Sequence, residues 1–213
     1  LHSRAGKRLH IAMDHYQFIA ERFQNTIETI TLSVDELAGP LAEAADCMVK
    51  SLLDDRKIIC CGNGVDAALA QLFTCYLVDS LHVDRPALPA MTLGAELAGL
   101  TAVAGSNGFD DIFSRQLQAL GQPGDVLLCI NTAEGEPGLL RAVEAARERN
   151  MIVVALTNNR GEALAAVLSQ QDITLRVNAP DRARCLEVQA MAVHSLCELI
   201  DNQLFGAYEE NDA

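Results

Sequence analysis

The sequence predicts an α/β domain built on a parallel sheet with helices on both faces. Strand-like apolar segments alternate with helical segments, a pattern typical of consecutive βαβ units. The runs at 126–130 (VLLCI) and 151–156 (MIVVAL) lack polar alternation, as expected for strands that are covered on both faces. The length of 213 residues fits one such domain.

Two helices are expected before the first strand. Asp14 is a suitable N-cap for the first helix, whose apolar side chains recur at helical spacing from Ile19 to Val34. The second helix is expected to begin near Pro40 and to reach Leu52. Neither helix can bury its apolar stripe alone, so both must pack on the sheet or on another subunit.

The remaining elements follow in order along the chain. The expected strands span residues 57–61, 88–93, 126–130, 151–156 and 172–177. The expected helices span residues 66–79, 95–104, 110–120, 139–150, 162–168 and 184–204. Pro89 weakens the second strand, because proline cannot donate to a strand ladder.

The first twelve residues differ from the rest of the chain. Arg4, Lys7 and Arg8 precede Met13, so residues 1–12 are either a leader or tag-like segment before a natural start, or a basic arm. The fold prediction therefore covers residues 13–213, as a single domain with an N-terminal helical extension.

The charge and the hydropathy pattern exclude several kinds of partner. A formal net charge of −13 repels phosphate backbones, so no direct nucleic-acid binding is expected, whereas a basic protein partner is compatible. No apolar run reaches the roughly 18 residues that a membrane-spanning helix needs. The seven cysteines are odd in number and show no CxxC spacing. Cys60, Cys61 and Cys129 lie in apolar runs, which favours reduced core thiols in a cytoplasmic protein.

Ligands of open α/β sheets bind beyond the carboxyl ends of the strands, so two loops are candidates. The first, at 62–67, contains Asn63 and Gly64, and its glycines would let backbone N–H groups approach an anion. It matches neither a GxGxxG nor a P-loop pattern. The alternative is a tight turn followed by Asp66 as a helix N-cap. The second loop spans residues 131–138.

Four segments carry a resemblance to a known family. They are LLDDRKIICCGNG at 52–64, GQPGDVLLCI at 121–130, AVEAARERNMIVVALT at 142–157 and CELIDNQLF at 197–205. Together they resemble the sugar isomerase (SIS) domain family, in the branch of phosphoheptose isomerase and the DnaA initiator-associating protein (DiaA). The resemblance covers residues 13–205 and implies a flavodoxin-like three-layer α/β/α fold with a five-stranded parallel sheet. It also implies a homotetramer with sugar-phosphate sites at subunit interfaces.

The catalytic pattern of the isomerase is largely missing. The resemblance implies a His and a Glu one helical turn apart after the first loop, and a Gln and a second His on the final helix, several of which bind zinc. Leu72, Tyr76 and Leu186 occupy the first three places, and only the last is kept, as His194. Leucine cannot ligate a metal, so we expect no metal, no cofactor and no acid/base pair. His194 is either a catalytic candidate or a packed residue of the helix.

The phosphate-binding pattern of the family, STSGNS, is also altered. The pocket implied by the resemblance consists of Asn63, Gly64, Asp66, Asn131, Thr132, Glu134 and Glu136. Three of these are carboxylates where an anion should bind, and Asp66 replaces a serine. Two like charges about 6 Å apart repel by roughly 3 kcal/mol at an effective dielectric constant of about 20. Alternatively, Glu134 and Glu136 stabilise the start of the following helix.

The resemblance implies that the initiator-associating relative binds the replication initiator through a Leu-Phe pair near its C-terminus. This chain has Leu204 and Phe205 there, although the isomerase can carry the same pair and both residues could instead anchor the last helix. The sequence therefore predicts a catalytically silent SIS-domain homo-oligomer that binds a protein partner, favouring the replication initiator. The alternatives are an isomerase-like enzyme, a sugar-phosphate-binding sensor with an altered site, and a scaffold without ligand.

Overall fold

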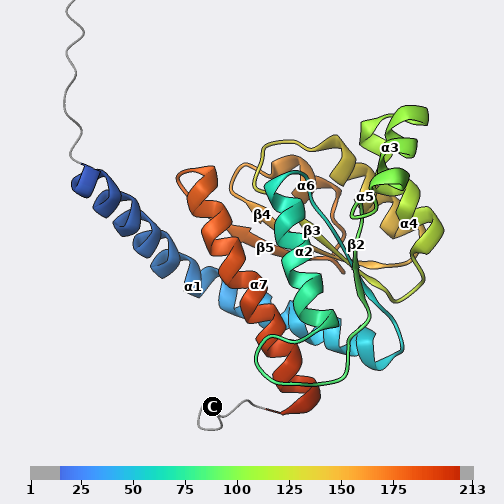
Figure 1. Ribbon diagram of the computed structural model, residues 1–213, viewed down its shortest axis with the longest axis horizontal. Coiled ribbons are helices and arrows are strands. Elements are labelled where there is room, and N and C mark those ends of the chain that lie inside the picture. Colours follow the sequence, from blue (N-terminus) through green and yellow to red (C-terminus); the bar gives the residue numbers. More distant parts are fainter. Residues whose placement is uncertain (1–14, 207–213) are drawn as a thin grey trace, which may run out of the picture.

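The computed structural model describes residues 15–206, in which five parallel strands form one sheet between two layers of helices (Figure 1). The strands are β1 (Ile58–Cys61), β2 (Ala90–Thr92), β3 (Val126–Ile130), β4 (Ile152–Asn158) and β5 (Ile173–Val177). Their order in the sheet is β2-β1-β3-β4-β5, and every neighbouring pair is parallel. The predicted three-layer α/β/α fold with a five-stranded parallel sheet is confirmed.

The helices divide between the two faces of the sheet. One face is covered by α1 (His15–Leu53), α2 (Val65–Val78) and α7 (Arg182–Phe205). The other face is covered by α3 (Leu97–Ser106), the 3-10 helix η1 (Phe109–Asp111), α4 (Ser114–Leu120), α5 (Pro137–Glu148) and α6 (Glu162–Val167). Alternate strand residues point to opposite faces of the sheet. Ile58 and Cys60 belong to the core under α1, α2 and α7, whereas Ile59 and Cys61 belong to the core on the other face.

The N-terminal region forms one helix of 39 residues, so the prediction of two helices divided near Pro40 is wrong. Proline in a helix interior removes one backbone hydrogen bond and crowds the preceding turn. Here the buried stripe continues across it, from Leu37 to Ala44 and Met48, and the helix packs against α7 and β5. The expected N-cap, Asp14, lies outside the described residues, as does the segment 1–12.

The first half of α1 projects beyond the sheet (Figure 1). Its large apolar side chains are exposed in the single chain: Tyr16, Phe18, Ile19, Phe23, Ile27, Leu32 and Val34. Side chains of this size are buried in most folded proteins. Tyr16, Ile19, Phe23 and Ile27 share one face and line a common hollow, so this exposed apolar row indicates an interaction surface.

The other elements lie close to their predicted positions. The strand at 126–130 matches β3, and the edge strand β2 starts after Pro89, whose carbonyl accepts the Ile58 N–H at 3.0 Å. The expected helix at 110–120 is divided into η1 and α4. All seven cysteines are free, and burial raises the pKa of the Cys60 thiol well above its ordinary value. Within residues 15–206, no helix is both long and apolar enough to cross a membrane.

Candidate functional site

The candidate site lies at the point where the strand order of the sheet reverses. From the neighbouring strands β1 and β3, the chain continues outward in opposite directions, to β2 and to β4. In open α/β sheets with this order, the ligand crevice lies outside the carboxyl ends of the two strands at the switch point. The β1–α2 loop (residues 62–64) and the β3–α5 loop (residues 131–136) meet there, as the sequence predicts.

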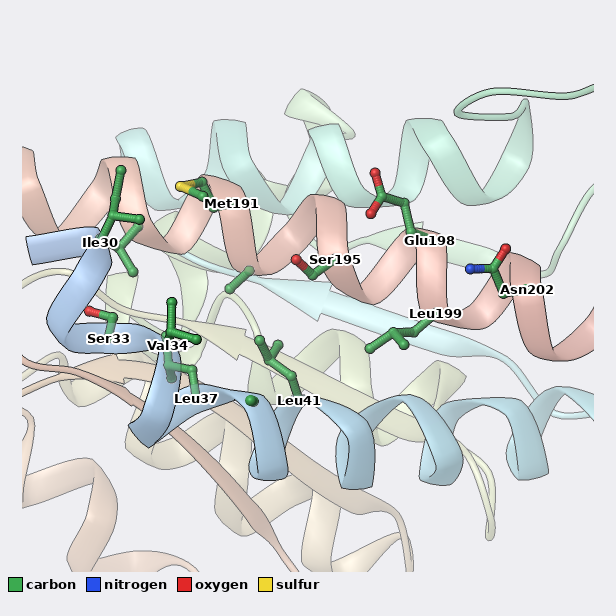
Figure 2. A pocket seen from close by; sticks show the side chains of 13 residues that line it. Ile30, Ser33, Val34, Leu37, Leu41, Met191, Ser195, Glu198, Leu199 and Asn202 are labelled. Atoms are coloured by element: carbon green, nitrogen blue, oxygen red, sulfur yellow. The ribbon is translucent and has the colours of Figure 1, made fainter. Parts of the chain in front are cut away.

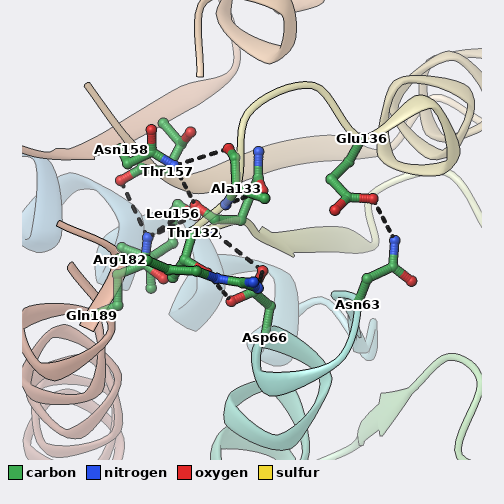
Figure 3. Close-up of polar contacts among 11 residues, drawn as sticks. Asn63, Asp66, Thr132, Ala133, Glu136, Leu156, Thr157, Asn158, Arg182 and Gln189 are labelled. Atoms are coloured by element: carbon green, nitrogen blue, oxygen red, sulfur yellow. Dashed lines mark hydrogen bonds and ion pairs between the residues drawn. The ribbon is translucent and has the colours of Figure 1, made fainter. Parts of the chain in front are cut away.

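The two loops are joined by a buried carboxylate (Figure 3). Asp66 is the second residue of α2, and only 1% of its surface is exposed. One of its oxygens accepts the Thr132 N–H at 3.1 Å, and the other accepts the Thr132 hydroxyl at 2.6 Å. The N-cap of α2 is Gly64, with φ of 61° and no side-chain cap. The alternative reading of Asp66 as an N-cap is therefore wrong, because its carboxylate is turned to the neighbouring loop.

A guanidinium group completes this cluster. Arg182 begins α7, and its Nε donates to the Thr132 hydroxyl oxygen at 2.8 Å. A terminal nitrogen of the same guanidinium lies 3.7 Å from the Asp66 carboxylate. Asp181 fixes this end of α7 as its N-cap, since its side chain accepts the Arg184 N–H at 3.0 Å. The sequence did not indicate Arg182 as a site residue, because it lies outside the two loops, 62–67 and 131–138, that were selected as candidates.

A second side-chain contact, besides the one between Asp66 and Thr132, joins the same two loops. The Asn63 side chain donates to the Glu136 carboxylate at 2.9 Å (Figure 3). Glu136 is the N-cap residue of α5, but its side chain caps no backbone N–H of that helix. Glu134 points outward, with 73% of its side chain exposed, and pairs with Arg160 at 3.3 Å. Of the three carboxylates expected around an anion, two therefore bridge the loops and one is exposed.

The β3–α5 loop is held in place by hydrogen bonds from buried amide side chains. Gln189 of α7 is fully buried and donates to the carbonyls of Asn131 and Thr157, at 3.1 and 3.2 Å. Asn158 at the end of β4 donates to the carbonyl of Ala133 at 3.0 Å. The Asn131 side chain accepts the Ala133 N–H at 2.9 Å. Gln189 and Asn158 are loop-supporting residues that the sequence did not reveal, because their partners lie on other elements.

A polar cavity of about 270 Å³ opens beside this loop, between the ends of β4 and β5 and the start of α7. Its walls carry Thr132, Ala133, Glu134, Asn158, Asn159, Arg160, Ala179, Asp181, Arg182 and Cys185. Burial raises the pKa of the Cys185 thiol to about 12, so this cysteine is protonated at neutral pH and is no nucleophile. The cavity can offer arginine and amide donors, but its carboxylates oppose an anion.

The expected catalytic positions do not line this cavity; they lie on α2 and α7. Leu72, Tyr76 and Leu186 are half-buried and pack against the core. His194 is half-buried, and its ring lies 5.6 Å from the Tyr76 ring, at an interplanar angle of 58°. A zinc ion, which the family implies, does not fit these residues, because the leucines offer no donor atom. Within the part of the chain that the structure describes, no three His, Cys, Asp or Glu side chains are grouped to hold a metal.

The two residues of the expected partner site differ in their surroundings. Leu204 is half-buried and packs against the core, whereas Phe205 is 45% exposed at the end of α7. The guanidinium carbon of Arg85 lies 5.8 Å from the centre of the Phe205 ring. Arg85 itself is buried and forms a 2.8 Å ion pair with Asp201. Phe205 is therefore exposed to solvent and contacts Arg85, which is itself fixed by its ion pair with Asp201. Leu204 packs the end of the helix against the core.

Comparison with known proteins now identifies the family. Residues 22–158 match the SIS domain. The chain belongs to the SIS domain family. This SIS protein is 41% identical to a phosphoheptose isomerase from Halorhodospira halophila over 194 residues, which cover 91% of this chain and 98% of the relative. It is 42% identical to the DnaA initiator-associating protein DiaA from Photorhabdus laumondii over 183 residues, or 86% of this chain and 93% of the relative.

Solved structures agree with this assignment. The phosphoheptose isomerase GmhA from Neisseria gonorrhoeae superposes with a TM-score of 0.83 at 36% identity, covering 88% of this chain and 98% of that chain. A phosphoheptose isomerase from Francisella tularensis gives a TM-score of 0.86 at 37% identity, covering 89% and 100%. The predicted branch of the SIS family is confirmed. Since relatives with both names are about equally similar, similarity alone does not choose between an isomerase and an initiator-associating protein.

Proposed function

We propose that this SIS protein is a catalytically silent homo-oligomer in the cytoplasm, and that it binds a protein partner to regulate the initiation of replication. One relative carries the name DnaA initiator-associating protein, so the replication initiator DnaA is the partner we propose. The choice against an isomerase depends on the residues of the site.

The observation that carries this proposal is the loss of the proton-transfer groups. Leu72, Tyr76 and Leu186 stand where the isomerase resemblance requires His, Glu and Gln. General acid–base catalysis needs titratable groups within hydrogen-bond reach of the substrate, and a leucine supplies none. The remaining His194 lies against the aromatic ring of Tyr76. His194 therefore lacks the histidine, the carboxylate and the glutamine that the isomerase resemblance implies beside it.

The ligand loop supports the same conclusion. The donors of Thr132 are already engaged by the Asp66 carboxylate, and the neighbouring Asn63 is engaged by Glu136. A sugar phosphate would have to displace both carboxylates before it could reach these donors. The alternative function, an isomerase-like enzyme or sugar-phosphate sensor, is favoured by the polar cavity beside Arg160 and Arg182.

The proposed oligomer follows from the surface of α1. An apolar groove of about 410 Å³ lies between α1 and α7 (Figure 2). The main apolar residues of this α1–α7 groove are Ile30, Val34, Leu37, Leu41, Met191 and Leu199. The exposed apolar row at the start of α1 is of matching chemistry, so two copies can cover one another's apolar surfaces. A tetramer would arise by repeating such contacts with closed symmetry.

The proposed partner contact is centred on Phe205. An exposed aromatic ring on a rigid base is typical of a binding hot spot, because little side-chain entropy is lost when the partner covers it. The net charge of −13 would speed the approach of a partner with a basic surface. Several copies of the ring in one oligomer would add avidity to weak single contacts.

The partner contact is tested by capture of purified DnaA on the immobilised chain. We expect the wild type to retain DnaA, and Phe205→Ala to weaken retention by at least about tenfold, or about 1.4 kcal/mol. Phe109→Ala is the matched control, because Phe109 is 57% exposed but lies on the opposite layer of helices. Equal retention by all three proteins would remove Phe205 from the contact, and no retention by the wild type would refute the proposed partner.

A further inference from the structure

Three kinds of hydrogen-bond donor converge at the switch point of the sheet. They are the backbone N–H of Thr132, the hydroxyl of Thr132 and the guanidinium of Arg182. Backbone amides, hydroxyls and arginines are the groups with which proteins hold phosphate and carboxylate anions. In this chain the two Thr132 groups donate to one acceptor, the carboxylate of Asp66 (Figure 3). The Arg182 guanidinium donates to the Thr132 hydroxyl oxygen and lies 3.7 Å from the same carboxylate.

The contacts have the geometry of a charge-assisted site. The Thr132 hydroxyl lies 2.6 Å from one Asp66 oxygen, within the range of an O–H bond to an ionised acceptor. The other oxygen receives the Thr132 N–H at 3.1 Å and lies 3.7 Å from Arg182. Since Asp66 is only 1% exposed, water can satisfy little of its charge, and these donors must do so.

The same donors form the edge of an open space. Thr132 and Arg182 line the 270 Å³ polar cavity, whereas Asp66 does not line it. The Arg182 side chain is 55% exposed. A small solute can therefore reach Thr132 and Arg182 from the cavity, but the Thr132 donors are already engaged by Asp66, and the Arg182 guanidinium is already held by Thr132 and Asp66.

We propose that Asp66 is an internal anion, which fills the anion-binding position of the switch-point crevice and excludes phosphate monoesters from it. The inference deepens the proposed function and rests on it, because it supplies the physical reason for the absence of a sugar-phosphate ligand. The donors themselves remain intact. Removal of the carboxylate therefore creates a phosphate site from residues that the chain already has.

The first test is a gain of binding. We would titrate inorganic phosphate and glucose 6-phosphate into the wild type and Asp66→Ser and follow the heat of binding. We expect no saturable binding by the wild type up to about 10 mM, and a dissociation constant at least about tenfold lower for Asp66→Ser. Asp54→Ser is the matched control, because it makes the same change in charge at an exposed turn after α1.

The second test asks whether the new site uses the proposed donors. Adding Arg182→Gln to Asp66→Ser should weaken phosphate binding by at least about tenfold, since a charged bidentate donor is lost. Asp66→Ala also removes the whole carboxyl group, so it tests the idea if the serine variant fails to fold. We expect Asp66→Ala also to bind phosphate more tightly than the wild type.

Two results would overturn the inference. One is a folded Asp66→Ser or Asp66→Ala protein that binds phosphate no better than the wild type. The other needs no variant: a saturable shift of the Thr132 amide resonance when phosphate is added to the wild type would show that Asp66 leaves the site open. Retention of DnaA is measured with the same proteins. If the wild type retains no DnaA, the proposed function is refuted, but the proposed role of Asp66 as an internal anion is not.

Discussion

The Thr132 hydroxyl lies 2.6 Å from the carboxylate of Asp66, which precedes it by 66 residues in the chain. This hydrogen bond joins the loops that follow β1 and β3, the two strands at the switch point of the sheet. In other open α/β proteins the crevice between such loops holds the ligand. Here the chain itself supplies the acceptor, so the contact belongs to the stability of the fold as well as to its function.

The stability of this contact can be measured with Thr132→Val. Valine has nearly the same shape but no hydroxyl, so one oxygen of a carboxylate that is 1% exposed loses its closest donor. An unsatisfied buried acceptor costs about 1–3 kcal/mol, and we expect the free energy of unfolding in urea to fall by that amount.

Thr101→Val is the control for this substitution. Thr101 is exposed on α3, and its hydroxyl donates only to carbonyls of its own helix. The free energy of unfolding of the Thr101→Val protein should differ from that of the wild type by less than about 0.5 kcal/mol. Equal losses in the two variants would show that the Thr132 hydroxyl contributes nothing specific to the loop contact.

The start of α7 should make stability depend on pH through Asp181. The hydrogen bond from the Arg184 N–H lowers the pKa of this N-cap carboxyl below its ordinary value of 3.8. Because the folded protein prefers the charged form, the stabilisation is complete above pH 3.8 and is lost as the pH falls through the lowered pKa. Asp181→Asn lacks this titration, so the stability difference between wild type and variant should shrink in acid.

Urea unfolding at neutral pH and at several values below pH 3.8 provides the measurement. Asp35→Asn is the control, because Asp35 is exposed in the middle of α1 and caps no helix. A wild-type advantage over Asp181→Asn that is the same at every pH would contradict the assignment of this titration to the N-cap.

The exposed apolar row of α1 predicts self-association. Sedimentation at micromolar concentration should show a homo-oligomer for the wild type, with a tetramer as the expected state. Phe23→Glu should shift it towards smaller species, because Phe23 is 69% exposed in the single chain and its ring would be buried by another copy.

A change of the same kind outside α1 provides the comparison. Val83→Glu adds the same charge to a side chain that is 40% exposed in the connection between α2 and β2. This variant should sediment like the wild type. A wild type that sediments as a monomer would refute the proposed assembly, whatever the variants do.

The fold could be predicted from the sequence because its signals are local. The run VLLCI becomes β3 at the predicted residues, since a strand buried on both faces consists only of apolar residues. The failure at Pro40 has the opposite cause. A proline is a local signal for a helix end, but the apolar stripe on either side of it is buried against α7 and β5, and this packing keeps α1 continuous.

The site was predicted less completely, because its interactions join distant segments. The sequence placed the loops around Asn63 and Thr132 directly after strands, and the structure has them there. The hydrogen-bond partner of Asp66 could not be predicted from the residues next to it in the sequence, because these suggested that Asp66 is a helix N-cap. Arg182 and Gln189 carry no local motif, and only the packing of α7 across the end of the sheet brings them to the β3–α5 loop.

The central claim, that the site is catalytically silent, is tested most directly by the turnover of sedoheptulose 7-phosphate by the purified wild type. We expect no turnover above background, because Leu72, Tyr76 and Leu186 replace the His, Glu and Gln that the isomerase resemblance implies. Typical enzymes turn over about 1–1,000 times per second, so even residual activity would be visible in such an assay. Turnover that is abolished by His194→Ala would contradict the account and establish this SIS protein as an isomerase.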